Sequence, residues 1–186
     1  MPLQTGRWTE ARTAHQALGV IAAVALIAGA ARVAIPLPGT PVPVTLQPIA
    51  VLLVGGLLGA VPGAFALLAY LTLGALGAPV FSGGGAGLPW LLGPTGGYLA
   101  AFPVAAFAVG ALLGRTPGLV RASLGTAAGL VVILTGGVAQ LALVSGQGLE
   151  GAFRMGALPF LPGGAVQVAL AVLLLRVIGG DPARRA

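Results

Sequence analysis

Polar and aromatic side chains gather in two stretches of a chain that is otherwise strongly apolar. The first, TPVPVTLQ at 40–47, offers the hydroxyl of Thr45 and the amide of Gln47. The second, GAPVFSGGGAGLPWLLGPTGGYL at 77–99, offers Phe81, Ser82, Trp90, Thr95 and Tyr98. Amides and hydroxyls beside aromatic surface hold small polar ligands by hydrogen bonds in a cavity. These residues therefore predict a small-molecule binding site.

The composition places this site in a membrane protein. Hydrophobic residues make up 58% of the chain, charged residues only 6%, and the mean hydropathy is +1.05. A span needs roughly 20 apolar residues, so 186 residues allow about six helices and a single domain, residues 1–186, in the lipid bilayer. The net charge of +6 comes from scattered arginines and not from a basic face, which argues against nucleic-acid binding.

Several of the candidate residues also have a purely structural interpretation. Trp90 and Tyr98 fit the belt of aromatic side chains at a membrane surface. Phe81 fits a packed core, and Gly96 and Gly97 fit a close approach of two helices, which is compatible with a ligand site beside them.

The remaining side chains exclude most enzyme chemistry. Hydrolysis or group transfer needs a nucleophile with a base, paired carboxylates or a metal cluster. The chain has no cysteine, one histidine, His15, and three acids, Glu10, Glu150 and Asp181, none of them in the middle of a predicted span. It also has no lysine, which a Walker A phosphate loop requires. We therefore expect no enzyme activity, no cofactor and no metal, and any energy must come from a partner.

Breaks at Pro and Gly divide the chain into apolar runs that predict six membrane helices with both termini on one side. The runs cover residues 17–35, 45–60, 63–78, 94–113, 124–144 and 159–178. A tight turn at 61–63 separates the second and third runs, which are short for a full span. Residues 79–93 predict a long ordered or gating loop, and a Gly-rich loop holds Glu150 and Arg154.

The arginines predict which side is cytoplasmic, because short cytoplasmic loops collect basic residues. With the termini inside, two arginines, Arg32 and Arg154, fall outside. The inner ones are Arg7, Arg12, Arg115, Arg121, Arg176, Arg184 and Arg185. The long Pro/Gly-rich loops then lie outside, and we expect the ligand site to face outward.

Two long segments resemble the BioY family. They are IPLPGTPVPVTLQPIAVLLVGGLLG at 35–59 and GALGAPVFSGGGAGLPWLLGPTGGYLAAF at 74–102. A third match, ALPFLPG at 157–163, resembles the start of the last helix of that family. The resemblance covers most of the chain and implies an all-α membrane protein of six transmembrane helices, with the fold of energy-coupling factor (ECF) S components. It implies a subunit of the plasma membrane that captures biotin outside and delivers it inward, with a T component and two ABC ATPases as partners.

The resemblance also implies a partner surface on the first helix. S components of this kind meet the T component through small residues, commonly an Ala-x-x-x-Ala pattern. Ala30 and Ala34 match that spacing, and Ala25 with Gly29 gives a variant of it. Small residues at this spacing let helices approach closely, although chance or packing within the chain explains the match in an Ala-rich helix equally well.

One motif departs from the family pattern. The last helix usually reads Pro-Phe-x-x-Gly-Asp-x-x-Lys, and here the Asp and Lys positions are Gly164 and Gln167. The resemblance implies that these groups contact the ligand, so their loss removes a charge-assisted pair. We hypothesise that Arg154 meets the ligand carboxylate, or alternatively stays a solvated loop charge. The expected neutral hydrogen-bonding groups are Gln47, Gln140 and Gln167.

Three functions stay open at this point. The first is biotin uptake as an S component. The second is an S component whose specificity has shifted to another vitamin-like ligand. The reason for this alternative is the departure from the family pattern at Gly164 and Gln167. The third is a membrane enzyme or a structural helical protein. The missing catalytic groups argue against an enzyme, and the elaborate outer loops argue against a purely structural protein.

Overall fold

A computed structural model of the chain describes residues 5–114 and 118–179, with side chains from residue 16 onward. The main helices are α1 Thr5–Ala30, α2 Gln47–Leu58, α3 Ala60–Ala75, α4 Leu88–Leu92, α5 Gly96–Leu113, α6 Leu119–Val144, α7 Gly148–Gly156 and α8 Leu161–Gly179. Short elements complete them: strands β1 Ala34–Ile35 and β2 Val44–Thr45, and 3₁₀ turns Ser82–Gly84 and Leu158–Phe160. Some residues named in the sequence predictions have side chains that the structure does not describe. They are Arg7, Glu10, Arg12, His15, Arg115, Asp181, Arg184 and Arg185.

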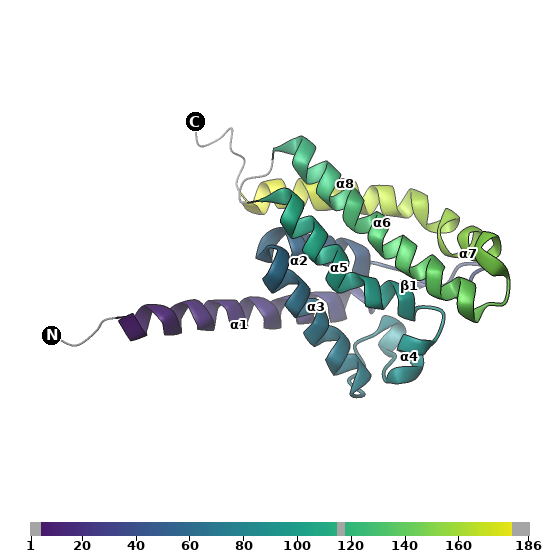
Figure 1. Cartoon of the computed structure of the whole chain (residues 1–186), viewed down its shortest axis with the longest axis horizontal. Coiled ribbons are helices and arrows are strands. Elements are labelled where there is room, and N and C mark those ends of the chain that lie inside the picture. The colour runs from purple at the N-terminus through teal and green to yellow at the C-terminus, as the bar shows by residue number, and fades with distance from the viewer. Residues whose placement is uncertain (1–4, 115–117, 180–186) are drawn as a thin grey trace.

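The helices form a bundle in which α5 and α6 lie side by side (Figure 1). Their contact depends on glycines, because a Cβ atom on Gly97 would collide with the carbonyl oxygen of Gly136 and one on Gly137 would collide with the ring of Tyr98. The start of α1 and the end of α8 point toward one end of the bundle. The short helices α4 and α7 lie toward the other end.

The first helix ends earlier than the sequence pattern predicts. We expected it to continue to residue 35, but α1 stops at Ala30, and Ala34 and Ile35 pair with Thr45 and Val44 in an antiparallel ladder. Pro36 explains the difference, because the residue before a proline is pushed toward extended backbone. The ladder folds the proline-rich segment back so that β2 runs directly into α2.

The turn between the second and third helices lies at Gly59, and the prediction of a turn at 61–63 was wrong. Gly59 has a φ of 86°, in the region that favours glycine, and α3 begins at the next residue. Pro62 therefore lies in the first turn of α3, where a missing N–H costs little. At 1.5 Å per residue, α2 and α3 are about 18 and 24 Å long, short of a membrane core of roughly 30 Å.

Two of the three predicted outer loops contain helical structure. The segment 79–93 holds the 3₁₀ turn at Ser82 and the five-residue helix α4. The segment expected to be a Gly-rich loop around Glu150 and Arg154 is instead helix α7. These two side chains favour a helix because they stand four residues apart, with the acid in the first turn and the base in the last.

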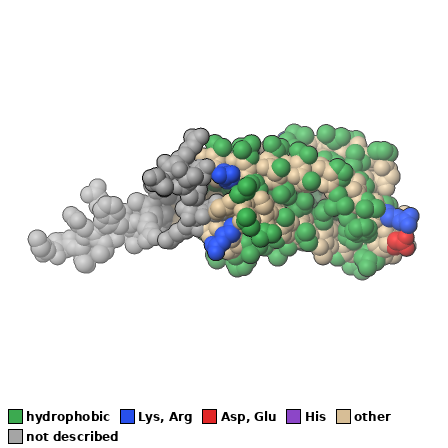
Figure 2. Space-filling view, turned by 90° about the horizontal axis from the view of Figure 1, so that it is seen from above, with side chains coloured by type: hydrophobic (Ala, Val, Ile, Leu, Met, Phe, Trp, Pro, Cys, Tyr) green, Lys and Arg blue, Asp and Glu red, His purple; other side chains and the backbone are tan. Residues whose placement is uncertain are grey.

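The outer surface is suited to lipid. Within the described residues, three helical segments are long and apolar enough to cross a membrane: Gly96–Leu113, Leu119–Val144 and Gly148–Ile178. Three shorter apolar helices accompany them, Gln16–Ala30, Gln47–Leu58 and Ala60–Ala75. On the face in Figure 2, hydrophobic side chains dominate and charged ones lie toward the ends. Large side chains such as Leu143 and Leu76 are 84% and 80% exposed, as expected for residues that face acyl chains.

Candidate ligand-binding site

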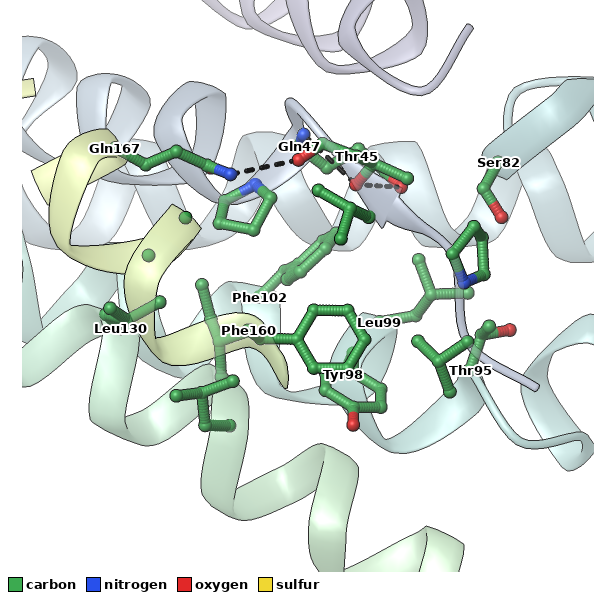
Figure 3. A pocket seen from close by; sticks show the side chains of 18 of the residues that line it. Thr45, Gln47, Ser82, Thr95, Tyr98, Leu99, Phe102, Leu130, Phe160 and Gln167 are labelled. Carbon is green, nitrogen blue, oxygen red and sulfur yellow. Dashed lines mark hydrogen bonds between the residues drawn. The ribbon is translucent and has the colours of Figure 1, made fainter. Parts of the chain in front are cut away.

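A cavity lies among β2, α2, α5, α6 and α8 and brings both predicted polar stretches together (Figure 3). Its empty space amounts to about 710 Å³, part of which is open to solvent. Its lining residues are Val42, Pro43, Val44, Thr45, Gln47, Pro48, Ser82, Thr95, Tyr98, Leu99, Phe102, Leu130, Ile133, Leu134, Pro159, Phe160, Gly163, Gly164 and Gln167.

The lining has a polar side and an apolar side. Thr45, Gln47 and Gln167 lie together along one side of the cavity in Figure 3, with Ser82 beyond them. The rings of Tyr98, Phe102 and Phe160 and the side chain of Leu130 form the opposite side. A ligand with a hydrogen-bonding head and an apolar body fits this division.

Helix starts surround the cavity. Gln47, Tyr98 and Gly164 stand in the first turns of α2, α5 and α8 respectively, while α6 contributes side chains from its middle. The N-terminal end of a helix carries a partial positive charge, which favours a ligand oxygen nearby. The arrangement therefore adds a weak electrostatic preference to the neutral hydrogen-bonding groups.

Gln167 fastens α8 to the start of α2. Its Oε1 accepts a hydrogen bond from the backbone N–H of Ile49 at 3.0 Å, and its Nε2 donates to the carbonyl of Thr45 at 3.1 Å. The side chain is buried, at 8% exposure. Since both ends of this amide are engaged with backbone, Gln167 shapes the cavity wall, and one N–H and one oxygen lone pair remain for a ligand.

Gln47 starts a buried chain of hydrogen bonds that leads to the second polar stretch. Its Nε2 donates to the hydroxyl of Tyr70 at 2.8 Å, and that hydroxyl donates to the carbonyl of Val80 at 2.9 Å. The Oε1 atom of Gln47 faces only the Thr45 hydroxyl, at 3.4 Å. This oxygen is therefore the acceptor that Gln47 can offer to a ligand.

Ser82 offers a hydroxyl that is not otherwise used. Its side chain is 6% exposed and lines the cavity, yet it makes no hydrogen bond within the part of the chain that the structure describes. The backbone around it is held by the turn that follows α1, because the N–H of Gly83 donates to the carbonyl of Ala31 at 3.1 Å and Arg32 donates to the carbonyl of Pro79 at 2.7 Å.

Three of the predicted ligand residues lie outside the cavity lining. Phe81 is fully buried, and its ring packs edge-on against Tyr70, 5.6 Å between centroids. Trp90 is partly buried and packs on the core beside Gly85. Gln140 donates from Nε2 to the carbonyls of Leu91 and Gly93, at 2.8 and 2.7 Å, and so fastens the end of α4 to α6. These contacts assign all three a supporting position in the structure.

Arg154 also lies away from the cavity lining. It forms an ion pair with Glu150 along α7, at 2.8 Å, and its side chain is 70% exposed. Such an exposed pair contributes little to stability. The cavity wall nearest in sequence comes instead from Pro159 and Phe160, so we leave Arg154 out of the proposed site.

Not all of the residues expected to contact a partner lie on one face of α1. Ala25 and Gly29 are both exposed on α1, and a Cβ atom at Gly29 would meet nothing within 4 Å. Ala30 is half-buried at the last position of α1. Ala34 lies in β1, so the expected helical pair of Ala30 and Ala34 does not form, because the helix ends before it.

Most of the apolar side of the cavity, other than Tyr98, was not predicted from the sequence. Phe102 could have been found, since it follows Tyr98 by one helical turn and must share its face. Phe160 stands in the segment 157–163 that matched the family. Leu130 and Ile133 carry no such signal, because leucine and isoleucine at helical spacing look the same in a core as in a binding site.

Comparison with known proteins identifies the family. The family model described as "BioY family" matches residues 5–180. The chain belongs to the BioY family. A probable biotin transporter BioY of Pyrococcus horikoshii is 45% identical over 141 residues, which cover 76% of this chain and 83% of the relative. The biotin transporter BioY of Rhizobium etli is 40% identical over 147 residues, covering 74% and 78%.

A solved structure shows that this BioY chain is also similar to a known protein in its fold. It is the crystal structure of the S component for biotin from an ECF-type ABC transporter, 25% identical to this chain with a TM-score of 0.79. The alignment covers 95% of this chain and 94% of the other. The chain therefore has the fold of an ECF S component, as its sequence resemblance implied.

Proposed function

We propose that this chain captures biotin in the cavity described above, as the S component of an ECF transporter. It is a transporter component and not an enzyme. The observation that carries the proposal is the cavity itself, because it joins 40–47, 77–99 and 157–163, the stretches whose residues match a family of biotin transporters.

The chemistry of biotin fits the two sides of the cavity. Its ureido ring carries two N–H donors and one carbonyl acceptor, while its thioether ring and aliphatic chain are apolar. Gln47 Oε1 and the Thr45 hydroxyl accept from the ureido N–H groups, and the Ser82 hydroxyl donates to the ureido oxygen. The rings of Tyr98, Phe102 and Phe160 cover the thioether ring and the chain.

We further propose that the whole chain is one substrate-binding domain in the plasma membrane, with six spans and both termini in the cytoplasm. The start of α1 and the end of α8 lie toward one end of the bundle, which supports a common side for both termini, and the distribution of arginines favours the cytoplasmic side. This orientation places α4, α7 and the cavity toward the outside, where biotin enters. A T component and two ABC ATPases supply the energy for release inside, and the exposed residues Ala25 and Gly29 of α1 are candidates for the contact.

Uptake of labelled biotin by cells that lack their own biotin transporter tests this function. Cells producing the chain with a T component and its ATPases are expected to accumulate biotin, and Gln47→Leu in the cavity is expected to lower uptake severalfold at limiting biotin. Gln147→Leu, an exposed change before α7, is the matched control. Equal uptake by cells with and without the chain would refute the proposal.

A further inference from the structure

The charge balance of the cavity limits which end of biotin it can enclose. Every residue that lines it is uncharged, and its polar groups are hydroxyls and amides. Biotin, in contrast, carries a carboxylate at the end of its aliphatic chain. Resting on the proposed function, we propose that this chain holds biotin by its ring system, leaves the carboxylate in the solvent, and therefore accepts biotin derivatives whose carboxylate is neutralised or extended.

The carboxylate of biotin can lie either inside the cavity or at its opening. Burying an ionised carboxylate without a charged partner is costly. The first turns of α2, α5 and α8 offset only a small part of that cost, because a helix end contributes a modest electrostatic term. The cavity is partly open to solvent, so a carboxylate at the opening keeps its hydration. The ring system then occupies the enclosed part.

Two arginines, Arg32 and Arg154, precede segments that line the cavity, and both make contacts outside it. Arg32 donates from Nη2 to the carbonyl of Pro79 at 2.7 Å, which holds the segment before Ser82. Arg154 pairs with Glu150 on α7. Neither is among the lining residues, and Gln167 spends its amide on the backbone of Thr45 and Ile49. No lining side chain distinguishes a carboxylate from an amide by charge.

Competition binding to the detergent-purified full chain tests the inference. Labelled biotin is displaced by biotin, by its primary amide, and by an amide extended with a short ethylene-glycol chain. We expect the three affinities to agree within about threefold. If a charged side chain bound the carboxylate, the affinity for biotin would exceed the affinity for either amide by more than about tenfold. A preference of that size for biotin would overturn the inference and leave the proposed function intact. Failure of all three ligands to bind would remove both.

A pair of variants at one position makes the test independent of absolute affinity. Gln167→Lys puts a positive charge into the lining and is expected to make the chain prefer biotin over its amide severalfold. Gln167→Glu keeps an acceptor for the N–H of Ile49 and is expected to reverse that preference. Arg154→Ala is expected to leave the ratio of the two affinities unchanged. A wild-type preference for biotin that disappears in Arg154→Ala would contradict the inference, because it would assign the carboxylate to that arginine.

Discussion

At the scale of single residues, the cavity depends on two buried amides that are bonded to other parts of the protein. Gln47 is 3% exposed and Gln167 8% exposed, yet each has a partner, as buried polar groups require. The sequence indicated Thr45, Gln47, Ser82, Tyr98, Gly164 and Gln167, which all line the cavity. It could not indicate how each amide divides its hydrogen bonds between protein and ligand, because that division depends on contacts between distant segments such as α2 and α8.

Tyr70→Phe tests the hydrogen-bond chain behind the cavity. The change removes the hydroxyl between Gln47 and Val80 and leaves the Nε2 atom of Gln47 without its partner. We expect a loss of about 1 kcal/mol in stability and a severalfold loss in biotin affinity, measured by thermal unfolding in detergent and by equilibrium binding. Thr72→Val, which removes an exposed hydroxyl from the same helix, is the matched control. Equal effects of the two changes would contradict the role assigned to this chain of bonds.

At the scale of helices, most elements could be predicted from the apolar runs, but the end of α1 and the whole of α7 could not. Apolar runs in the sequence located α2, α3, α5, α6 and α8 within a few residues, because burial in lipid favours long apolar helices. They did not locate the end of α1, where Pro36 and the ladder with β2 compete with the helix. Helix α7 was also missed, because its glycines indicated a loop while its Glu150–Arg154 pair favours a helix.

Gly97→Ala tests the contact between α5 and α6. The added methyl group would collide with the backbone oxygen of Gly136, which cannot move without separating the helices. We expect a loss of about 1–3 kcal/mol in stability and weaker biotin binding, since the next residue, Tyr98, lines the cavity. Gly29→Ala is the control, because its methyl group would meet nothing within 4 Å. If Gly97→Ala were as stable as Gly29→Ala, α5 and α6 would have to be packed less closely than the structure shows.

Gly29→Leu tests the proposed partner surface on α1. The residue is exposed and is not among those that line the cavity, so we expect biotin binding by the purified chain to be unchanged. A bulky side chain there would keep the T-component helix from approaching closely, so energised uptake is expected to fall severalfold. Uptake equal to that of the wild type would mean that the partner surface lies elsewhere. Leu18→Ala is the control, because Leu18 is also exposed on α1 and the change adds no bulk.

At the scale of the whole molecule, the orientation in the membrane can be tested directly, because the chain contains no cysteine. Single cysteines at Gln147, before α7, and at Gly118, before α6, both occupy exposed positions. With an impermeant maleimide, intact cells are expected to label Gln147→Cys, while Gly118→Cys reacts only after permeabilisation. The reverse pattern would contradict an outward-facing cavity.

The central claim is that this cavity binds biotin, and equilibrium binding of labelled biotin to the purified chain tests it most directly. Unlabelled biotin, thiamine and riboflavin serve as competitors, and a folded state confirmed by cooperative thermal unfolding serves as the control. We predict saturable binding that only biotin displaces, despite Gly164 and Gln167 in the positions of the usual charged pair. Displacement by thiamine or riboflavin, or no biotin binding by the folded chain, would contradict the account.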